Sequence, residues 1–137
     1  MVVMAESRAK AEGREPLARI LAWSWAGVPP EIMGIGPVPA TKKVLDKTGL
    51  TIADFDRIEI NEAFAAQVIA CERELKFDRD LLNVNGGGIS LGHPIGMSGA
   101  RIILALAYEL RASDKQLGLA TLCISGGQGL AVVLERA

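Results

Sequence analysis

Apolar and polar residues along the chain alternate in short runs typical of an α/β protein. The apolar runs Leu17–Ala26 and Leu117–Ile124 are bounded by proline, glycine and charged residues, and their length favours buried strands over helices. Shorter runs at Val2–Met4, Arg57–Ile60 and Leu130–Glu135 predict three further strands.

Helical patterns separate these strands. The mostly polar segment Ala5–Gly13 predicts a surface helix ending at glycine, and Thr41–Gly49 predicts a second helix. Asn61 is expected to cap a third helix, which continues to about Leu75, with Glu62 in its first turn. The order β-α-β-α-β-α-β-β predicts an α/β fold, a mixed and mostly parallel sheet with helices on both faces and an antiparallel terminal hairpin.

The helix predicted from Gly96 to about Arg111 has almost no solvated face. Arg101 and Glu109 are the only charged residues between Gly96 and Leu110, so we expect this helix to be buried on all sides. The sheet would cover one side, and residues outside this sequence would cover the other. Left uncovered, so large an apolar surface would promote self-association.

A segment rich in proline and glycine, residues 29–39, interrupts the pattern of strands and helices. Its stiff backbone would expose Ile32, Met33 and Ile35 without collapse, which suits the wall of a ligand site. A plain connector between two elements explains the same composition equally well.

Composition limits the classes of function. A chain of 137 residues that is 50% apolar can form one domain over residues 1–137. Lys and Arg number 15 against 16 Asp and Glu without blocks of one sign, so neither nucleic acid nor a membrane surface is an expected partner. No apolar segment is long enough for a signal peptide or a membrane span, and the two cysteines and single histidine predict neither a disulfide framework nor a metal site. We expect a cytoplasmic protein.

Three polar residues lie where a strand or loop leads into the next element. Asn61 follows a strand, His93 follows a glycine-rich loop, and Cys123 ends a strand before a glycine turn. Such positions collect ligand sites in open α/β sheets, and an amide, an imidazole and a thiol can move protons at carbon and hold an oxyanion. Each residue also has a simpler interpretation, as a helix cap, an ordinary loop histidine and a buried structural cysteine. Cys71, in the middle of a helix, is expected to be inert packing.

Other catalytic motifs are incomplete. The chain has no Gly-Lys-Ser/Thr for a phosphate loop, and its glycines do not match the dinucleotide fingerprint. Ser125 lacks the glycine two positions earlier that a hydrolase nucleophile elbow requires, and no second histidine is available for a triad. A hydrolase using Ser125 is therefore a weak alternative.

Three segments resemble the C-terminal signatures of the thiolase family, which includes acetyl-CoA acetyltransferases and 3-ketoacyl-CoA thiolases. These are Asn61–Ala66 (NEAFAA), Gly86–Gly96 (GGGISLGHPIG) and Cys123–Gly129 (CISGGQG), and they occur in the family's order. The intervening segments match as well. The resemblance implies a thiolase-like C-terminal domain, with the half that carries the nucleophilic cysteine outside this sequence.

The resemblance also implies a role for each of the three polar residues. In thiolases a cysteine of the N-terminal half attacks an acyl-CoA thioester, and the histidine matching His93 activates that thiolate and helps bind the thioester oxygen. Asn61 matches the residue that holds a water completing this oxyanion hole. Cys123 matches the thiol that moves a proton at the α-carbon of the second acyl-CoA, in a Claisen condensation or its reverse.

Further site residues follow from the same resemblance. The backbone N–H of Ser125 matches a donor of the second oxyanion hole at a position that is usually glycine, so its side chain could crowd the acyl group. Met33 and Phe64 match apolar residues that contact the pantetheine arm or acyl group, and Gly126 is expected to line the same site. Coenzyme A thioesters are the implied substrates, with no permanently bound cofactor.

The resemblance thus predicts the C-terminal part of an acyl-CoA acyltransferase that binds acyl-CoA, needs the missing N-terminal half and forms a homo-oligomer. Alone, the chain is expected to show no turnover. The alternative is a non-catalytic module that keeps the fold and binds acyl-CoA or a protein partner. The joint presence of Asn61, His93 and Cys123 favours the enzyme, because a binding module needs no such set.

Overall fold

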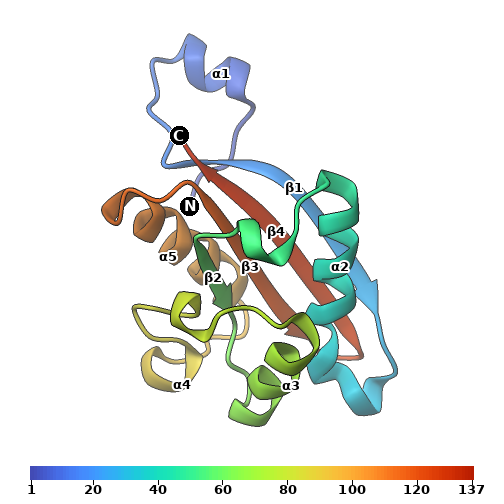
Figure 1. Ribbon diagram of the computed structural model, residues 1–137. Coiled ribbons are helices and arrows are strands. Elements are labelled where there is room, and N and C mark those ends of the chain that lie inside the picture. Colours follow the sequence, from blue (N-terminus) through green and yellow to red (C-terminus); the bar gives the residue numbers. More distant parts are fainter.

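The computed structural model describes residues 1–137 and is built on one four-stranded sheet (Figure 1). The strands are β1 (Ala18–Gly27), β2 (Arg57–Ile60), β3 (Leu117–Ile124) and β4 (Gln128–Arg136), in the spatial order β1-β4-β3-β2. Only β2 and β3 run parallel, whereas β4 is antiparallel to both of its neighbours. The prediction of a mostly parallel sheet is therefore wrong, because the C-terminal strand of the hairpin enters the middle of the sheet and reverses direction against both β3 and β1.

Four of the five α-helices form where the sequence predicts them, with shifted ends, whereas the short helix at Gly88–Leu91 was not predicted. They are α1 (Glu6–Ala11), α2 (Pro37–Thr48), α3 (Ala65–Leu75), α4 (Gly88–Leu91) and α5 (Ser98–Ala112), with short 3₁₀ helices η1 (Pro30–Ile35), η2 (Ile52–Asp54) and η3 (Arg79–Leu81). None of the helices has the length and apolarity needed to cross a membrane.

Two segments differ from their predicted structure. Val2–Met4 forms no strand, and Val2 and Val3 are 81% and 65% exposed, so the predicted first strand is absent. Residues 29–39 are not an irregular loop, since they form η1 and the first turn of α2. Proline is tolerated in a first helical turn because its missing N–H has no helical partner there, which is why α2 begins at Pro37 rather than near Thr41.

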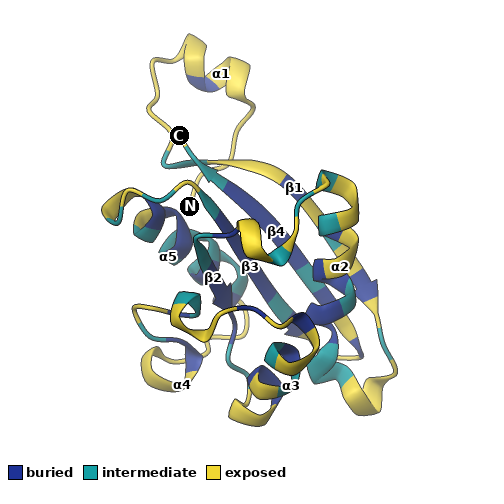
Figure 2. Cartoon of the chain, viewed as in Figure 1, coloured by how far each residue is buried: buried dark blue, intermediate teal, exposed yellow.

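The sheet has a separate apolar core on each face, because successive residues of a strand point to opposite sides. Beneath α2 and α3 the core includes Val44, Ile58 and Leu119, and beneath α5 it includes Ile102 and Leu106. Figure 2 shows the buried residues concentrated along β3 and β4, which both helical layers cover. The prediction of helices on both faces is confirmed.

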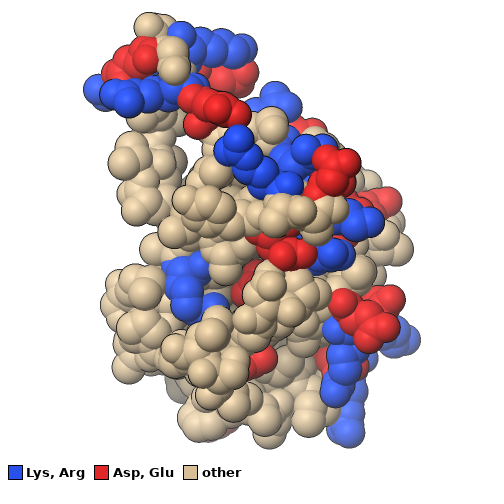
Figure 3. All heavy atoms as spheres, turned by 90° about the vertical axis from the view of Figure 1, so that its left-hand side faces the viewer, with Lys and Arg blue, Asp and Glu red and all other residues tan.

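The outer surface of α5 is only partly exposed. From Gly99 to Leu110, Tyr108 is the only exposed residue, and Ile103 and Leu104 are partly accessible. The adjoining loop exposes Ile95 (89%), and the face toward the viewer in Figure 3 carries a large uncharged area. That a further part of the protein covers this surface remains a prediction.

Candidate functional site

Asn61 lies directly after β2 at the carboxyl end of the parallel pair β2–β3. Its side chain is fully buried, and its backbone N–H donates to the Thr121 carbonyl at 3.0 Å. The prediction that Asn61 caps α3 is wrong, because the chain makes a non-helical turn first and α3 begins at Ala65 with Phe64 at the cap position. The Asn61 side chain is thus free to make other contacts.

His93 contacts Asn61 through one ring nitrogen and Ser98 through the other. Asn61 Nδ2 lies 3.3 Å from His93 Nε2, and His93 Nδ1 lies 2.6 Å from Ser98 Oγ. Because Ser98 Oγ donates its hydrogen to the Pro94 carbonyl, at 3.0 Å, it accepts from His93 Nδ1–H. With Ser98 as the donor to Pro94, we expect the imidazole proton on Nδ1, which leaves Nε2 as an acceptor.

The loop that carries His93 is anchored by two residues to which sequence reasoning gave no such role, Glu62 and Asn83. One carboxylate oxygen of Glu62 accepts from Asn83 Nδ2 and the other from the Ile89 backbone N–H, both at 2.9 Å. Asn83 also pairs with both the N–H and the carbonyl of Ile60, each at 3.0 Å. Glu62 therefore binds the first turn of α4 rather than the first turn of α3.

The glycines of this loop give a sequence signal for the contact. A Cβ on Gly87 would lie 2.2 Å from the Glu62 carboxyl carbon, so the carboxylate in this position leaves no room for a side chain at residue 87. The signatures NEAFAA and GGGISLGHPIG are physically joined at this point, which the separate motifs do not reveal.

Cys123 lies near the end of β3 and is 7% exposed. Burial raises the pKa of its thiol, so the thiol keeps its proton at neutral pH. No hydrogen bond joins this thiol to Asn61 or His93, and the three residues share the carboxyl end of β2–β3 rather than a common hydrogen-bond network. Cys71 is fully buried against η1, where its thiol donates to the Gly34 carbonyl at 3.5 Å, and burial raises its pKa to about 11.

The turn after Cys123 packs against the segment before η1. Ser125 and Gly126 are exposed, and Gly126 and Gly127 both have positive φ, 82° and 90°. The Gly127 carbonyl accepts from the Val28 N–H at 2.7 Å, and a Cβ on Gly127 would lie 2.1 Å from the Val28 carbonyl oxygen. This close approach fixes the turn, and with it the Ser125 backbone N–H.

Met33 and Phe64 lie on neighbouring elements at the same end of the sheet. Met33 is half-buried in η1, and Phe64 is 63% exposed at the start of α3. A shallow hollow of about 340 Å³ between η1 and α3 is lined by other residues, Ile32, Gly34, Ile35, Gln67 and Ala70. The proline-rich segment therefore does form one wall of a surface hollow.

A charged pair is buried behind Asn61. Arg101 of α5 donates from Nη2 to Asn61 Oδ1 at 3.4 Å, and its Nη1 lies 4.0 Å from Glu59 Oε2. Burial raises the pKa of Glu59 to about 7 although Arg101 opposes that shift. From the sequence, Arg101 was noted only as one of two charged residues in an apolar helix, because a charge in such a helix does not indicate its partner.

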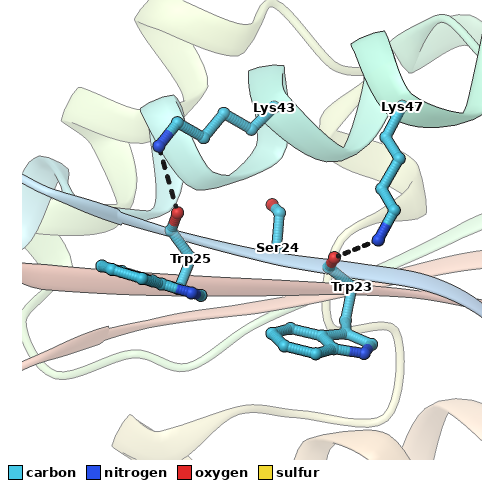
Figure 4. Close-up of a pocket in the computed structure, with 5 residues that line it drawn as sticks. All are labelled: Trp23, Ser24, Trp25, Lys43 and Lys47. Atoms are coloured by element: carbon cyan, nitrogen blue, oxygen red, sulfur yellow. Dashed lines mark hydrogen bonds between the residues drawn. The ribbon is translucent and has the colours of Figure 1, made fainter.

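A hollow of about 460 Å³ lies elsewhere, at the free edge of β1 (Figure 4). There Lys43 and Lys47 of α2 donate to the Trp25 and Trp23 carbonyls, both at 3.4 Å, and cover part of the unpaired strand edge. No group of three or more His, Cys, Asp or Glu side chains is placed to hold a metal ion.

Comparison with known proteins gives one consistent family. Residues 14–136 match the model described as "Thiolase, C-terminal domain". Acetyl-CoA acetyltransferase of Escherichia coli K12 is 60% identical over 136 residues, which is 99% of this chain and 34% of that protein, and the Paracoccus denitrificans protein of the same name is 52% identical. The chain therefore spans about a third of the length of these relatives.

Solved structures give the same result. The Bacillus anthracis acetyl-CoA acetyltransferase superposes with a TM-score of 0.95 at 52% identity, covering 98% of this chain and 34% of the other. Human mitochondrial 3-ketoacyl-CoA thiolase in complex with CoA superposes with a TM-score of 0.94 at 48% identity, covering 96% of this chain and 34% of the other.

Proposed function

This chain belongs to the thiolase family, and on that premise we propose that it supplies the histidine, the asparagine and the acid/base thiol of an acetyl-CoA acetyltransferase. The main support is the contact of Asn61 Nδ2 with His93 Nε2 at 3.3 Å, beside the strand end that carries Cys123. The reaction is the reversible Claisen condensation of two acetyl-CoA molecules, or thiolysis of a 3-ketoacyl-CoA.

The first half of the reaction uses His93. Its Nε2 accepts the proton of a nucleophilic cysteine that belongs to the part of the enzyme outside this chain. The resulting thiolate attacks the thioester carbonyl, the C–S bond to CoA breaks, and the imidazolium returns its proton to the CoA thiolate. Asn61, through a water, and His93 hold the oxygen that becomes negative in the tetrahedral intermediate. The contact of Nδ1 with Ser98 Oγ at 2.6 Å is consistent with this role, because a proton on Nδ1 leaves Nε2 free to accept.

The second half of the reaction uses Cys123. In the cleavage direction its thiol donates a proton to the α-carbon of the leaving enolate, which departs as acetyl-CoA. In condensation the Cys123 thiolate removes that proton from acetyl-CoA, the enolate attacks the carbonyl of the acylated nucleophilic cysteine, and the C–S bond to that cysteine breaks as the C–C bond forms. The raised pKa of the buried thiol supports the donor role at neutral pH. The N–H of Ser125 donates to the second oxyanion.

Substrate contacts extend along the same end of the sheet. Phe64 is exposed and Met33 is partly accessible, so both could contact the pantetheine arm or the acyl group, and Gly126 leaves space beside them. Coenzyme A thioesters are the substrates, with no permanently bound cofactor.

The rest of the enzyme is proposed from the length of its relatives. We infer that residues 1–137 are one C-terminal domain that works with an N-terminal half in a cytoplasmic homo-oligomer. By itself the chain lacks the nucleophilic cysteine and would give no turnover.

The experiment is a chimera in which this chain replaces the corresponding third of the Escherichia coli acetyl-CoA acetyltransferase. We expect the chimera, but not the chain alone, to cleave acetoacetyl-CoA when CoA is added. Changing His93 to Ala or Cys123 to Ala should lower kcat by at least about 100-fold, the scale of a lost acid–base group. The matched control is Cys71→Ala, which removes a second buried thiol and should leave kcat within about threefold. A folded chimera that tolerates both site changes would contradict the proposal.

A further inference from the structure

The buried pair formed by Glu59 and Arg101 takes no part in the chemistry proposed above. Glu59 lies on β2 two residues before Asn61, so both side chains point to the face covered by α5. The two charged side chains are 4% and 14% exposed, and Arg101 Nη2 donates to Asn61 Oδ1 at 3.4 Å. Arg101 therefore connects a buried carboxylate to a proposed site residue.

The geometry of this pair is poor for stability. Glu59 Oε2 and Arg101 Nη1 are 4.0 Å apart, and Glu59 Oε2, Arg101 Nε and Arg101 Nη1 have no hydrogen-bond partner. Burying two charges with incomplete hydrogen bonding can cost more free energy than their attraction returns. A second pair between the same two elements, Arg57 and Glu109, is hydrogen-bonded at 2.9 Å. The need to hold β2 and α5 together therefore does not explain why Glu59 and Arg101 are buried here.

We propose that Arg101, whose charge faces Glu59 across 4.0 Å, is a positioning residue that orients the Asn61 amide and through it selects the tautomer of His93. A guanidinium has donors only, so Asn61 has to present Oδ1 to it. Asn61 Nδ2 then faces His93 Nε2, which becomes the acceptor, and the imidazole proton goes to Nδ1. Without Arg101 the amide could rotate by half a turn and present its oxygen to Nε2, which would favour the opposite tautomer.

This inference deepens the proposed function, because the same Nε2 would take the proton of the nucleophilic thiol. An amide in the wrong orientation would leave Nε2 protonated and unable to act as a base. Glu59 and Arg101 would then influence the reaction without touching substrate.

The test is the tautomer of His93, measured by two-bond ¹⁵N–¹H correlation NMR on the 137-residue protein. His93 is the only histidine, so its ring signals need no assignment by mutation. In the unchanged protein we expect the pattern of a proton on Nδ1. Arg101→Met combined with Glu59→Gln removes both charges together, so no unpaired charge stays buried, and should give the averaged signals of a mixture. The matched control, Arg57→Met with Glu109→Gln, removes the neighbouring pair and should keep the unchanged pattern.

A second variant keeps the inference testable if the double variant does not fold. Ser98→Ala removes the partner of Nδ1 and leaves the Asn61 contact, so the Nδ1–H form should still predominate. A mixture in Ser98→Ala, or an unchanged pattern in the folded Arg101→Met/Glu59→Gln protein, would overturn the inference. Because NMR needs no substrate, this outcome is separate from activity: a chimera without turnover would refute the proposed function and leave the tautomer result standing.

Discussion

The contact between Glu62 and Gly87 allows a quantitative test of how the histidine loop is anchored. Gly87→Ala adds a Cβ 2.2 Å from the Glu62 carboxyl carbon, so the carboxylate has to move by more than an ångström. That movement would break its two 2.9 Å hydrogen bonds, to Asn83 and to the Ile89 N–H. Hydrogen bonds to a charged group contribute about 1.5–3 kcal/mol each, and partial exposure of this site reduces that, so we expect a loss of about 2–4 kcal/mol.

This loss of stability should disappear when Glu62 is absent. Glu62→Ala should itself cost about 2–4 kcal/mol, because both hydrogen bonds are lost. In that background Gly87→Ala should cost almost nothing, since φ at Gly87 is −124° and suits alanine. Urea unfolding of the four proteins gives the coupling free energy of the double-mutant cycle, expected at about 2–4 kcal/mol. Additive losses, with a coupling below about 0.5 kcal/mol, would refute the reasoning.

Three further predictions concern Glu59, the turn after β3 and the thiols. The pKa of Glu59 is raised to about 7, so the unfolded chain releases this proton at lower pH than the folded protein, and stability should fall as pH rises from about 4.5 to 7. Because one pKa unit is about 1.4 kcal/mol, the loss in the free energy of unfolding approaches about 3 kcal/mol at pH 7. Urea unfolding across this pH range should show a flatter dependence of stability on pH for Glu59→Gln. Parallel pH dependences of the two proteins would contradict the raised pKa of Glu59. Gly127→Ala should lower the free energy of unfolding by at least about 3 kcal/mol, since its Cβ would lie 2.1 Å from a carbonyl oxygen. Gly126→Ala, at a similar positive φ but with open space around the Cβ, should lower it by about 1–2 kcal/mol. Equal melting temperatures of these two variants would argue against the packing of the turn. Iodoacetamide should label Cys123 faster than Cys71, because Cys71 is fully buried and its pKa is raised to about 11. Peptide mass spectrometry after a timed reaction measures the labelling of both cysteines. Faster labelling of Cys71 would contradict the placement of η1 over it.

The candidate site was only partly predictable, and the failures have a common cause. Asn61 carries the local signal of a helix cap, yet the helix begins at Ala65 because Glu62 is bound to the loop at Ile89. The local preference of Asn61 for a helix cap was outweighed by the contact of Glu62 with Ile89, 27 positions later in the chain. Arg101 gave no signal of its role for the same reason, since its partner Asn61 is 40 positions away.

The local and chemical features of this protein could be predicted from short stretches of the chain. Short runs with clear boundaries predicted β2 and β3 to the residue, and three signature segments predicted the family, which the comparison confirms, together with the candidate site residues Asn61, His93 and Cys123. Such features depend on residues that are close in the chain, so they can be read without coordinates.

Which groups meet in space depends on how distant segments pack. The direction of the sheet depends on β4 pairing with β1, a strand about a hundred residues earlier in the chain, and no local pattern records which strand edges join. The two neighbours of the His93 ring, Asn61 and Ser98, are likewise brought to it by the docking of α5 on the sheet. Side-chain identity is a property of the chain, whereas hydrogen-bond geometry, burial and pKa arise only when distant segments pack together.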